Sequence, residues 1–148
     1  MSINSYRVLV TGSRDAHDPR PVDSALHQLL AVLEAGRRFV VVHGACRDKR
    51  GQLRGVDAFA DAWARRGQRA GYPIDIEQHP AEEHGAWPAC GPRRNQHMVN
   101  LGADAALAFI GPCTSTRCRR TEPHPSHGAS GCAALAEKAS IPTRRFTA

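Results

Sequence analysis

The sequence predicts an α/β fold, a Rossmann-like parallel sheet of about five strands with helices on both faces. Two observations lead to this prediction. Short apolar, β-branched runs, typical of buried strands, alternate with longer segments whose apolar residues recur at helical spacing. This alternation implies right-handed crossovers between parallel strands. The 148 residues are enough for a single domain, residues 1–148, with a hydrophobic core.

The strands are expected from composition and from the residues that end each run. The first two are almost wholly apolar at their centres and stop at Gly12 and Gly44. The third alternates apolar and polar residues and is closed by Pro80, and the fourth is a buried run stopped by Gly111. In chain order the expected strands are residues 6–11, 39–43, 74–77, 105–110 and, at an edge, 142–146.

Four helical segments are expected between these strands. The first has apolar residues at helical spacing and is followed by Gly36 as a stop signal. The second places Phe59 and Trp63 on one face, as core residues, and ends near Gly67. In chain order, the helical segments begin near Pro21, near Gly55, after the pair Gly91 and Pro92, and near Ala129. The last segment is expected to cover residues 129–139. Residues 47–54 and 81–89 are expected to be loops.

Glycine-rich polar loops follow several of the strands. In open α/β sheets ligands bind beyond the carboxyl ends of the strands, and glycine lets backbone N–H groups approach a phosphate closely. The loops expected at that edge are residues 12–15, 43–57 and 113–131. No Gly-x-Gly-x-x-Gly follows the first strand, and no Gly-x-x-x-x-Gly-Lys-Ser/Thr occurs. The sequence therefore disfavours a standard dinucleotide or NTPase site.

Arg93 and Arg94 follow a Gly-Pro pair where a helix is expected to begin. Proline suits the first turn of a helix, and a helix start offers free N–H groups and the positive end of the dipole. Guanidinium groups match a phosphate or a carboxylate. The stretch predicts an anion site. The alternative is that both arginines are solvated and only keep the protein soluble.

Four motifs, taken in order, resemble the YspA-type branch of the SLOG superfamily, which occurs in bacteria and phages. They are residues 11–15, residues 43–45 with 55–58, residues 91–98 leading to 102–104, and residues 126–128. The resemblance implies a Rossmann-like fold that binds a nucleotide or nucleotide-derived, phosphate-containing small molecule, as a sensor or ligand-binding module. The ligand-binding residues then expected are Gly12, Ser13, Arg14, Gly44, Asp57, Arg93, Arg94, Asn95 and Gly128.

The SLOG superfamily also includes the LOG nucleotide phosphoribohydrolases and the DprA DNA-binding proteins. A nucleotide hydrolase and a non-specific nucleic-acid binder are therefore the alternatives, and the sequence leaves open whether the protein is an enzyme. LOG enzymes carry a catalytic glutamate where this chain has Cys132, whereas Arg94 and Met98 match their Arg-x-x-x-Met pattern. The resemblance thus implies a retained anion site without the acid. It also marks residues 47–54 as an insertion that reshapes the ligand entrance or adds positive charge to it.

Several candidate residues have simpler explanations. Ser13 or Asp15 could cap an ordinary turn after the first strand. Asp57 could stabilise the helix dipole instead of accepting a ribose hydroxyl. His43, at a strand end, is expected to be a structural histidine more than a catalyst.

Cys113, Cys118, His124 and His127 have the order and residue types of a zinc site, with the spacing C-x4-C-x5-H-x2-H. The spacing departs from a zinc finger, because no long gap separates the two pairs. The alternative is a flexible basic loop with incidental thiols. Zinc is the one cofactor that the sequence suggests, because a loop with so little apolar content needs some other source of order.

Composition and net charge limit the kinds of binding partner. The net charge of +6 and the pI near 9.5 favour an anionic partner. Nucleic-acid binding should be weak, because the basic residues lack the interleaved aromatic residues that stack on single strands. Those basic residues are Arg117, Arg119, Arg120, Arg144 and Arg145.

Five cysteines, an odd number, favour free thiols or a metal site over a disulfide framework. No apolar run is long enough to cross a bilayer, and residues 1–5 lack the apolar core of a signal peptide. A cytoplasmic protein without a membrane partner is expected. The SLOG resemblance also suggests a homodimer.

Overall fold

The sheet is parallel throughout and has the strand order β3-β2-β1-β4-β5. The computed structural model describes residues 4–148, so residues 1–3, part of the segment considered for a signal peptide, lie outside the described residues. The strands are β1 (Ser5–Gly12), β2 (Arg38–His43), β3 (Ile74–Gln78), β4 (Ala105–Ile110) and β5 (Thr143–Thr147).

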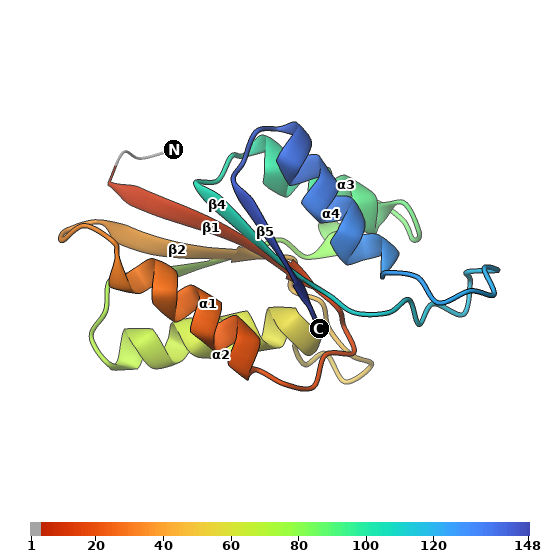
Figure 1. The fold of residues 1–148 in the computed structure, drawn as a ribbon, viewed down its shortest axis with the longest axis horizontal. Coiled ribbons are helices and arrows are strands. Elements are labelled where there is room, and N and C mark those ends of the chain that lie inside the picture. Colours follow the sequence, from red (N-terminus) through yellow and green to blue (C-terminus); the bar gives the residue numbers. More distant parts are fainter. Residues whose placement is uncertain (1–3) are drawn as a thin grey trace.

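Helices cover both faces of the sheet (Figure 1). The helices α1 (Arg20–Ala31) and α2 (Gly55–Arg69) lie on one face, and α3 (Cys90–Asn100) and α4 (His127–Lys138) lie on the other. A short 3-10 turn, η1 (Ala81–His84), precedes α3. The predicted α/β class, with its parallel sheet between two helical layers, is confirmed. Among residues 4–148 no helix has the length and apolar character needed to span a membrane.

The side chains of β1 show why both faces need cover. Successive strand residues point to opposite sides of a sheet. Val8 and Val10 pack with Leu26 of α1 and Trp63 of α2, whereas Leu9 packs with Met98 of α3 on the other side. The central strand is therefore apolar on both faces. Trp63 belongs to the first of these two cores, and the partly buried Phe59 packs against it, as expected.

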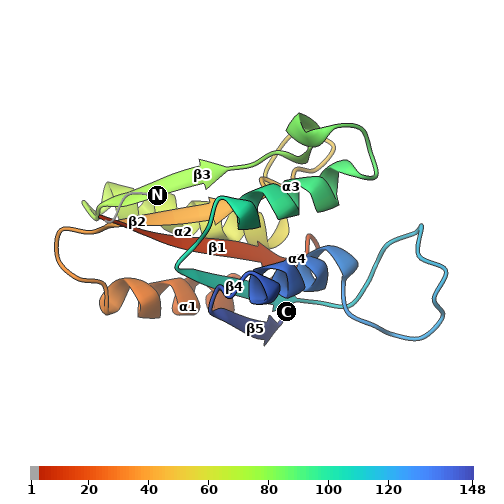
Figure 2. The ribbon, with the colours of Figure 1, turned by 90° about the horizontal axis from the view of Figure 1, so that it is seen from above.

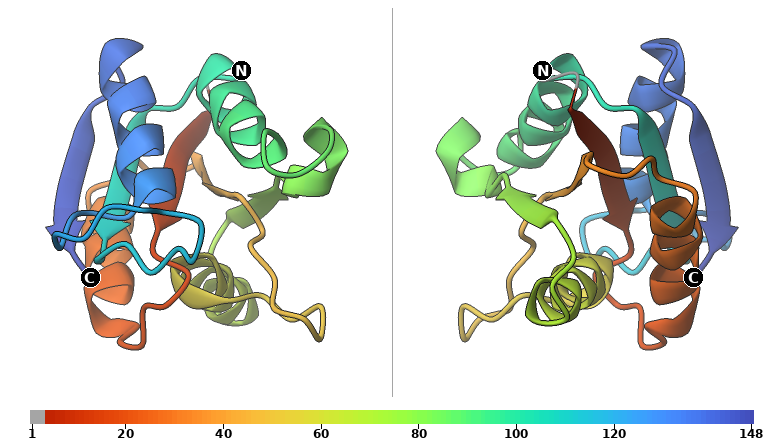
Figure 3. Two further views of the ribbon diagram at one scale, coloured as in Figure 1. Left: turned by 90° about the vertical axis from the view of Figure 1, so that its right-hand side faces the viewer. Right: turned by 90° about the vertical axis from the view of Figure 1, so that its left-hand side faces the viewer.

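The strand order reverses at β1, which pairs with β2 on one side and β4 on the other. At such a reversal, connections leave toward opposite faces, and a crevice forms at the carboxyl ends of the strands. The loop before α4 and the segment before α3 both extend beyond those ends (Figure 2). The left view of Figure 3 faces this edge, with the connecting loops grouped around the strand ends.

Two helix starts differ from the sequence-based expectation. Helix α3 begins at Cys90, so Gly91 and Pro92 form part of its first turn and no Gly-Pro turn precedes the helix. Proline has no N–H group, and first-turn N–H groups lack intrahelical partners, so the helix loses no bond there. Helix α4 begins at His127, before the expected Ala129.

Two helix ends also differ. Helix α1 stops at Ala31, well before Gly36. Helix α2 continues to Arg69, so Gly67 lies inside the helix and does not end it. A Cβ atom at Gly67 would lie 2.3 Å from the Cδ1 atom of Ile74, so a larger residue there would have to displace the end of the Ile74 side chain.

Candidate ligand and metal sites

A cavity of about 100 Å³ lies at the carboxyl end of β1, enclosed by the loop after β2 and by the first turns of α2 and α4. We call it the inner cavity. Seven of the predicted ligand-binding residues, from five separate segments of the chain, line it: Gly12, Arg14, Gly44, Asp57, Arg94, Asn95 and Gly128. Ser13 and Arg93 are not among the residues that line it.

The guanidinium of Arg94 lies against the backbone of Gly44. Its Nη1 donates to the carbonyl oxygen of Gly44 and, at 3.2 Å, to that of His79, while its Nε donates to Oδ1 of Asn95 at 2.7 Å. A Cβ atom at position 44 would lie 2.4 Å from this Nη1, so the contact requires glycine. Arg94 therefore joins α3 to the loop after β2. Within residues 4–148, its Nη2 is left without a hydrogen bond.

Arg14 supplies the free charge of the inner cavity. Its side chain is exposed and makes no hydrogen bond or short ion pair within residues 4–148. Its backbone is nevertheless fixed, because Arg54 Nε donates to the Arg14 carbonyl oxygen at 3.0 Å. Gly55 packs against the same loop with a φ of +62°, and a Cβ atom there would lie 2.4 Å from the Ser13 carbonyl oxygen. The first turn of α2 thus holds Arg14 at the cavity.

Ser13 and Arg93 have other environments. The buried Ser13 hydroxyl accepts a hydrogen bond from the N–H of Asp15 at 3.3 Å, which is the turn geometry considered as the alternative. The exposed Arg93 reaches the neighbourhood of Gly85, since a Cβ atom at Gly85 would lie 2.9 Å from Nη1 of Arg93. Neither side chain takes part in the wall of the inner cavity.

Asp57 lies in the first turn of α2 and is almost fully buried. Its Oδ2 accepts the N–H of Cys46 at 2.9 Å. Burial raises the pKa of the Asp57 carboxyl above its ordinary value, although the Cys46 N–H and the charge of Arg94 favour the carboxylate. The residue thus sits at the positive end of the α2 dipole and also forms part of the cavity wall.

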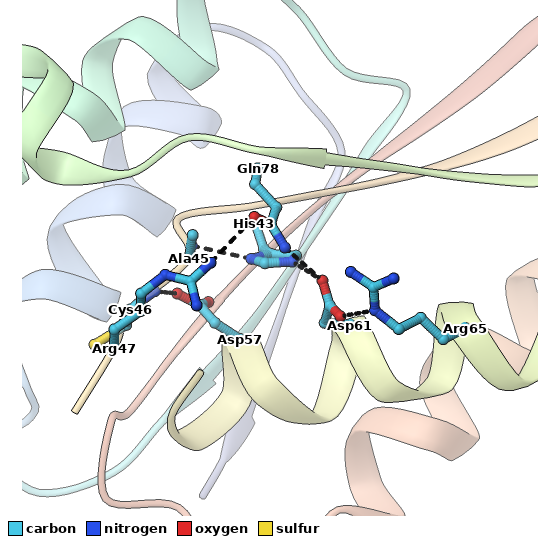
Figure 4. Close-up of polar contacts among 8 residues, drawn as sticks. All are labelled: His43, Ala45, Cys46, Arg47, Asp57, Asp61, Arg65 and Gln78. Atoms are coloured by element: carbon cyan, nitrogen blue, oxygen red, sulfur yellow. Dashed lines mark hydrogen bonds and ion pairs between the residues drawn. The ribbon is translucent and has the colours of Figure 1, made fainter. Parts of the chain in front are cut away.

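His43 is structural, as expected. It is 0% exposed, its Nδ1 accepts the N–H of Ala45 at 3.0 Å, and its Nε2 lies 2.9 Å from Oδ2 of Asp61 (Figure 4). Since Nδ1 accepts, Nε2 carries the proton and donates it to Asp61. Burial alone would raise the pKa of Asp61, but hydrogen bonds from Gln78, His43 and Arg65 outweigh burial and lower it. The network fixes the turn at Ala45, next to the cavity.

The first turn of α4 faces the inner cavity through Ser126, Gly128 and Ala129. This turn has no side-chain cap and no acidic residue. The first N–H groups of a helix lack intrahelical acceptors and carry the positive end of its dipole. Together with Arg14, they give the cavity the donors that a phosphate or carboxylate requires.

A larger groove of about 670 Å³ continues outward from the inner cavity. We call it the outer groove. The two share six lining residues, namely Arg14, Gly44, Cys46, Arg94, Asn95 and Gly128. Trp87 and Pro88, from the segment before α3, and Leu135 of α4 add apolar surface to the outer groove. Arg47 also lines it, so the segment of residues 47–54 adds a cation at the entrance.

The four predicted metal ligands lie together in the loop before α4. One ligand atom from each of Cys113, Cys118, His124 and His127 lies within 4.8 Å of the other three. The Sγ atom of Cys118 lies 3.4 Å from Nε2 of both histidines, and the two Nε2 atoms are 3.1 Å apart. This Cys/His cluster has the donor atoms of a metal site, and the residues present could hold one ion.

The distances among the ligand atoms of Cys118, His124 and His127 are close to those around a single tetrahedral ion, and a ligand atom of Cys113 lies within 4.8 Å of them. With Zn–N bonds of about 2.0–2.1 Å and Zn–S bonds of about 2.3 Å, two nitrogens are separated by about 3.3 Å and a nitrogen and a sulfur by about 3.6 Å. His124 is also oriented for ligation, because its Nδ1 lies 2.8 Å from the carbonyl oxygen of Glu122. A carbonyl oxygen only accepts, so the proton is on Nδ1 and the Nε2 lone pair faces the cluster.

Comparison with known proteins shows which protein family this chain belongs to. No protein-family model matches the sequence. The chain is similar to the Gene 61 protein of Mycobacterium phage D29, with 36% identity over 141 residues and 95% of each chain covered. The chain belongs to the family of this phage protein. A phage relative agrees with the expected bacterial or phage origin, while the assignment to the SLOG superfamily stays a prediction.

In this member of the Gene 61 family, the position that the SLOG resemblance would match to the LOG glutamate is Cys132, and it lies in the core. Cys132 is 0% exposed and packs with Leu9 and Ala136. Burial raises the pKa of its thiol, so it is neither an acid nor a thiolate nucleophile at neutral pH. The thiol of Cys46, which lines the inner cavity, also has a pKa raised by burial.

Sequence reasoning missed Trp87 as a site residue of this Gene 61 family protein. Residues 81–89 were expected to be a loop, and the tertiary structure places that segment beside the outer groove. One signal was present in the sequence. An isolated tryptophan in a stretch rich in glycine, alanine and proline has no helical or strand face to belong to, so a solvent-facing role could have been suspected.

Proposed function

We propose that this protein binds a nucleotide, or a nucleotide-derived small molecule containing phosphate, at the carboxyl edge of its sheet, and that it acts as a sensor or ligand-binding module. The observation that supports this most is that Arg14, Asp57, Arg94 and Gly128 line one cavity although they lie far apart in the sequence. The cavity also lies where open α/β sheets bind ligands.

The phosphate group is assigned to the inner cavity. The inner cavity has a volume of about 100 Å³, several times the roughly 10–15 Å³ that one water needs, so it has room for a small oxyanion group. Arg14 and the uncapped first turn of α4 provide the positive charge and the donors. Asp57 is the acceptor in the same wall and is suited to a ribose hydroxyl.

Binding without hydrolysis is the version of this proposal that the site supports. A LOG-type hydrolase needs a carboxylic acid near the bond that breaks. The matching position holds the buried Cys132, and the carboxylate in the cavity wall, Asp57, is already bonded to the Cys46 N–H. The anion-binding groups therefore have no acid at the expected place.

A thermal-shift screen tests the binding proposal, because a ligand that binds only the folded state raises the melting temperature. The panel contains inorganic phosphate, AMP, cyclic AMP, ADP-ribose and a single-stranded oligonucleotide. We expect stabilisation by at least one nucleotide. Replacing Arg14 by Ala should weaken that binding by about 1.5–3 kcal/mol, the usual contribution of a hydrogen bond to a charged group.

Arg93→Ala is the matched control, because Arg93 is exposed and lies outside the cavity wall. Its binding should equal that of the unmodified protein. If both variants lose the same binding affinity, the loss comes from the lower net charge and not from a contact of Arg14 with the ligand. Tight binding of the oligonucleotide that persists at high salt would favour the nucleic-acid alternative, since charge alone gives steeply salt-sensitive binding.

We further propose that the Cys/His cluster binds Zn²⁺ in a structural site. Four protein ligands close a tetrahedral ion and leave no position for a catalytic water. The thiolate and imidazole donors favour zinc over hard cations, which prefer oxygen ligands. All five cysteines are free thiols, which such a site requires and which suits a cytoplasmic location.

A further inference from the structure

Trp87 is the large aromatic side chain at the mouth of the site. It is 63% exposed, and its indole lines the outer groove. The other tryptophan of the chain, Trp63, is buried against Phe39 in the core on the opposite face of the sheet. Exposing a tryptophan leaves a large apolar surface in water, so its place beside a ligand groove calls for an occupant.

The groove and the inner cavity differ in chemistry from one end to the other. Arg14 lines both spaces, and the first turn of α4 faces the inner cavity. Trp87, Pro88 and Leu135 add the apolar surface of the outer groove, which the charged residues Arg47 and Glu82 also line. The outer volume of about 670 Å³ lies within the roughly 300–1,000 Å³ that is usual for small-molecule sites. An occupant that fits both ends has an anionic group at one end and a flat aromatic ring at the other.

We infer that Trp87 stacks against the base of the bound nucleotide while the phosphate occupies the inner cavity. Every nucleobase presents a π face, and a tryptophan ring beside a cationic pocket is a common arrangement for binding it. This inference rests on the proposed function and assigns the base end of that same site.

The Cys/His loop contributes to this base subsite. The guanidinium carbon of Arg117, which lies between the two cysteines of the cluster, is 5.8 Å from the centre of the Trp87 ring. His127, a member of the cluster, also lines the outer groove. The loop therefore places a second planar group, the Arg117 guanidinium, beside Trp87, and the start of α4 that follows it lines the groove. Guanidinium planes, like aromatic rings, stack on bases.

The position of the two tryptophans allows a direct test by fluorescence. AMP and ribose 5-phosphate share the phosphate and ribose, and only AMP has the base. AMP should quench the emission of exposed Trp87, and ribose 5-phosphate should not. In Trp87→Phe the quenching should disappear, because the remaining buried Trp63 cannot meet the ligand, while calorimetric affinity for AMP should stay within a few-fold.

Trp87→Ala measures the contribution of the ring to affinity. Its affinity for AMP should fall about 5- to 150-fold, which corresponds to stacking of one base, and its affinity for ribose 5-phosphate should be unchanged. Tyr72→Ala is the control, because Tyr72 is also an exposed aromatic residue, 52% exposed, and does not line the groove. Melting curves of both variants check that the fold is intact.

The outcomes separate this inference from the proposed function. Equal affinity of the unmodified protein for AMP and ribose 5-phosphate, with a loss for both ligands in Arg14→Ala, would overturn base stacking and leave phosphate binding standing. An unchanged AMP affinity in Trp87→Ala would also overturn base stacking and leave phosphate binding standing. Absence of binding for both ligands and for ADP-ribose would overturn both.

Discussion

The Nε2 atoms of His124 and His127 lie 3.1 Å apart, and Cys118 Sγ is 3.4 Å from each. Two imidazole nitrogens this close either share one proton or share one metal ion, and the thiols of the cluster favour the ion. His127 is also the first residue of α4, whose neighbours Ser126 and Gly128 line the inner cavity. The Cys/His cluster and the inner cavity are therefore adjacent along the chain.

The first prediction concerns zinc content. Protein purified without a metal-affinity step should contain about one zinc per chain by elemental analysis, as a four-ligand site requires. Cys118→Ser and His124→Asn should each lose most of it. Cys46→Ser and His27→Asn are the controls, because both residues lie outside the cluster. A zinc content below about a tenth of an equivalent in the unmodified protein would contradict the metal site, and the segment would then be an ordinary surface loop with reactive thiols.

The second prediction concerns what the ion does. Chelation should increase amide hydrogen exchange in residues 112–126 and leave β1 and β4 protected, because the strands are held by the two apolar cores. Zinc occupancy should also fall in acid, since protons compete for the thiolates and imidazoles. Global unfolding on chelation would contradict this local role.

The third prediction tests the close packing of α2 on the loop after β1. Gly55→Ala should lower the free energy of unfolding by about 3 kcal/mol or more, because it combines a left-handed backbone with a Cβ contact of 2.4 Å to the Ser13 carbonyl oxygen. Gly36→Ala is the control, since it has a φ of +87° and no atom within 4 Å. It should cost only about 1–2 kcal/mol in a urea titration.

The fourth prediction is a pH dependence. Arg7 of β1 reaches Glu77 of β3 with two hydrogen bonds of 2.7 Å and lowers the pKa of that carboxyl from 4.5 to about 2. The folded state therefore holds the charged form, and the stabilisation is complete above about pH 4.5 and is lost as the pH falls toward 2. Glu77→Gln should cost about 1–2 kcal/mol at pH 7, a figure reduced for partial exposure of Glu77.

In urea titrations from pH 7 to pH 2, the difference between Glu77→Gln and the unmodified protein should shrink below pH 4.5. Asp75→Asn is the control on the same strand. It removes an ion pair to Arg38 whose two side chains are about half exposed, so its effect should be much smaller. A constant difference across the whole pH range would contradict the role of the Glu77 charge.

The fifth prediction concerns catalysis. Incubation with AMP should release no adenine at enzymatic rates, because Cys132, which the SLOG resemblance would match to the LOG glutamate, is not a carboxylic acid and lies in the core. Chromatography of the reaction mixture measures the free base. Release at about one per second or faster would establish a hydrolase. Asp57→Asn would then show whether the buried carboxyl in the cavity wall is the acid.

The sequence by itself determined the fold class, a parallel sheet covered by helices on both faces, and brought together most of the residues that line the inner cavity. Strands rich in valine and other apolar residues, such as residues 39–43, must be buried on both faces, which requires helices on both sides. Parallel strands bring their carboxyl ends to one edge, so the loop glycines and Arg94 could be assigned to one site. The types and order of Cys113, Cys118, His124 and His127 also identified, from sequence alone, a group of residues that could hold a metal ion.

Only the tertiary structure decided which of these side chains face the cavity. Ser13 and Arg93 are neighbours of lining residues in the sequence, yet the Ser13 hydroxyl turns into a local hydrogen bond and Arg93 points to Gly85. Trp87 lines the outer groove because the tertiary structure brings the segment before α3 close to α4. Sequence patterns record periodicity along one segment, whereas the direction of a loop side chain depends on contacts between segments far apart in the chain.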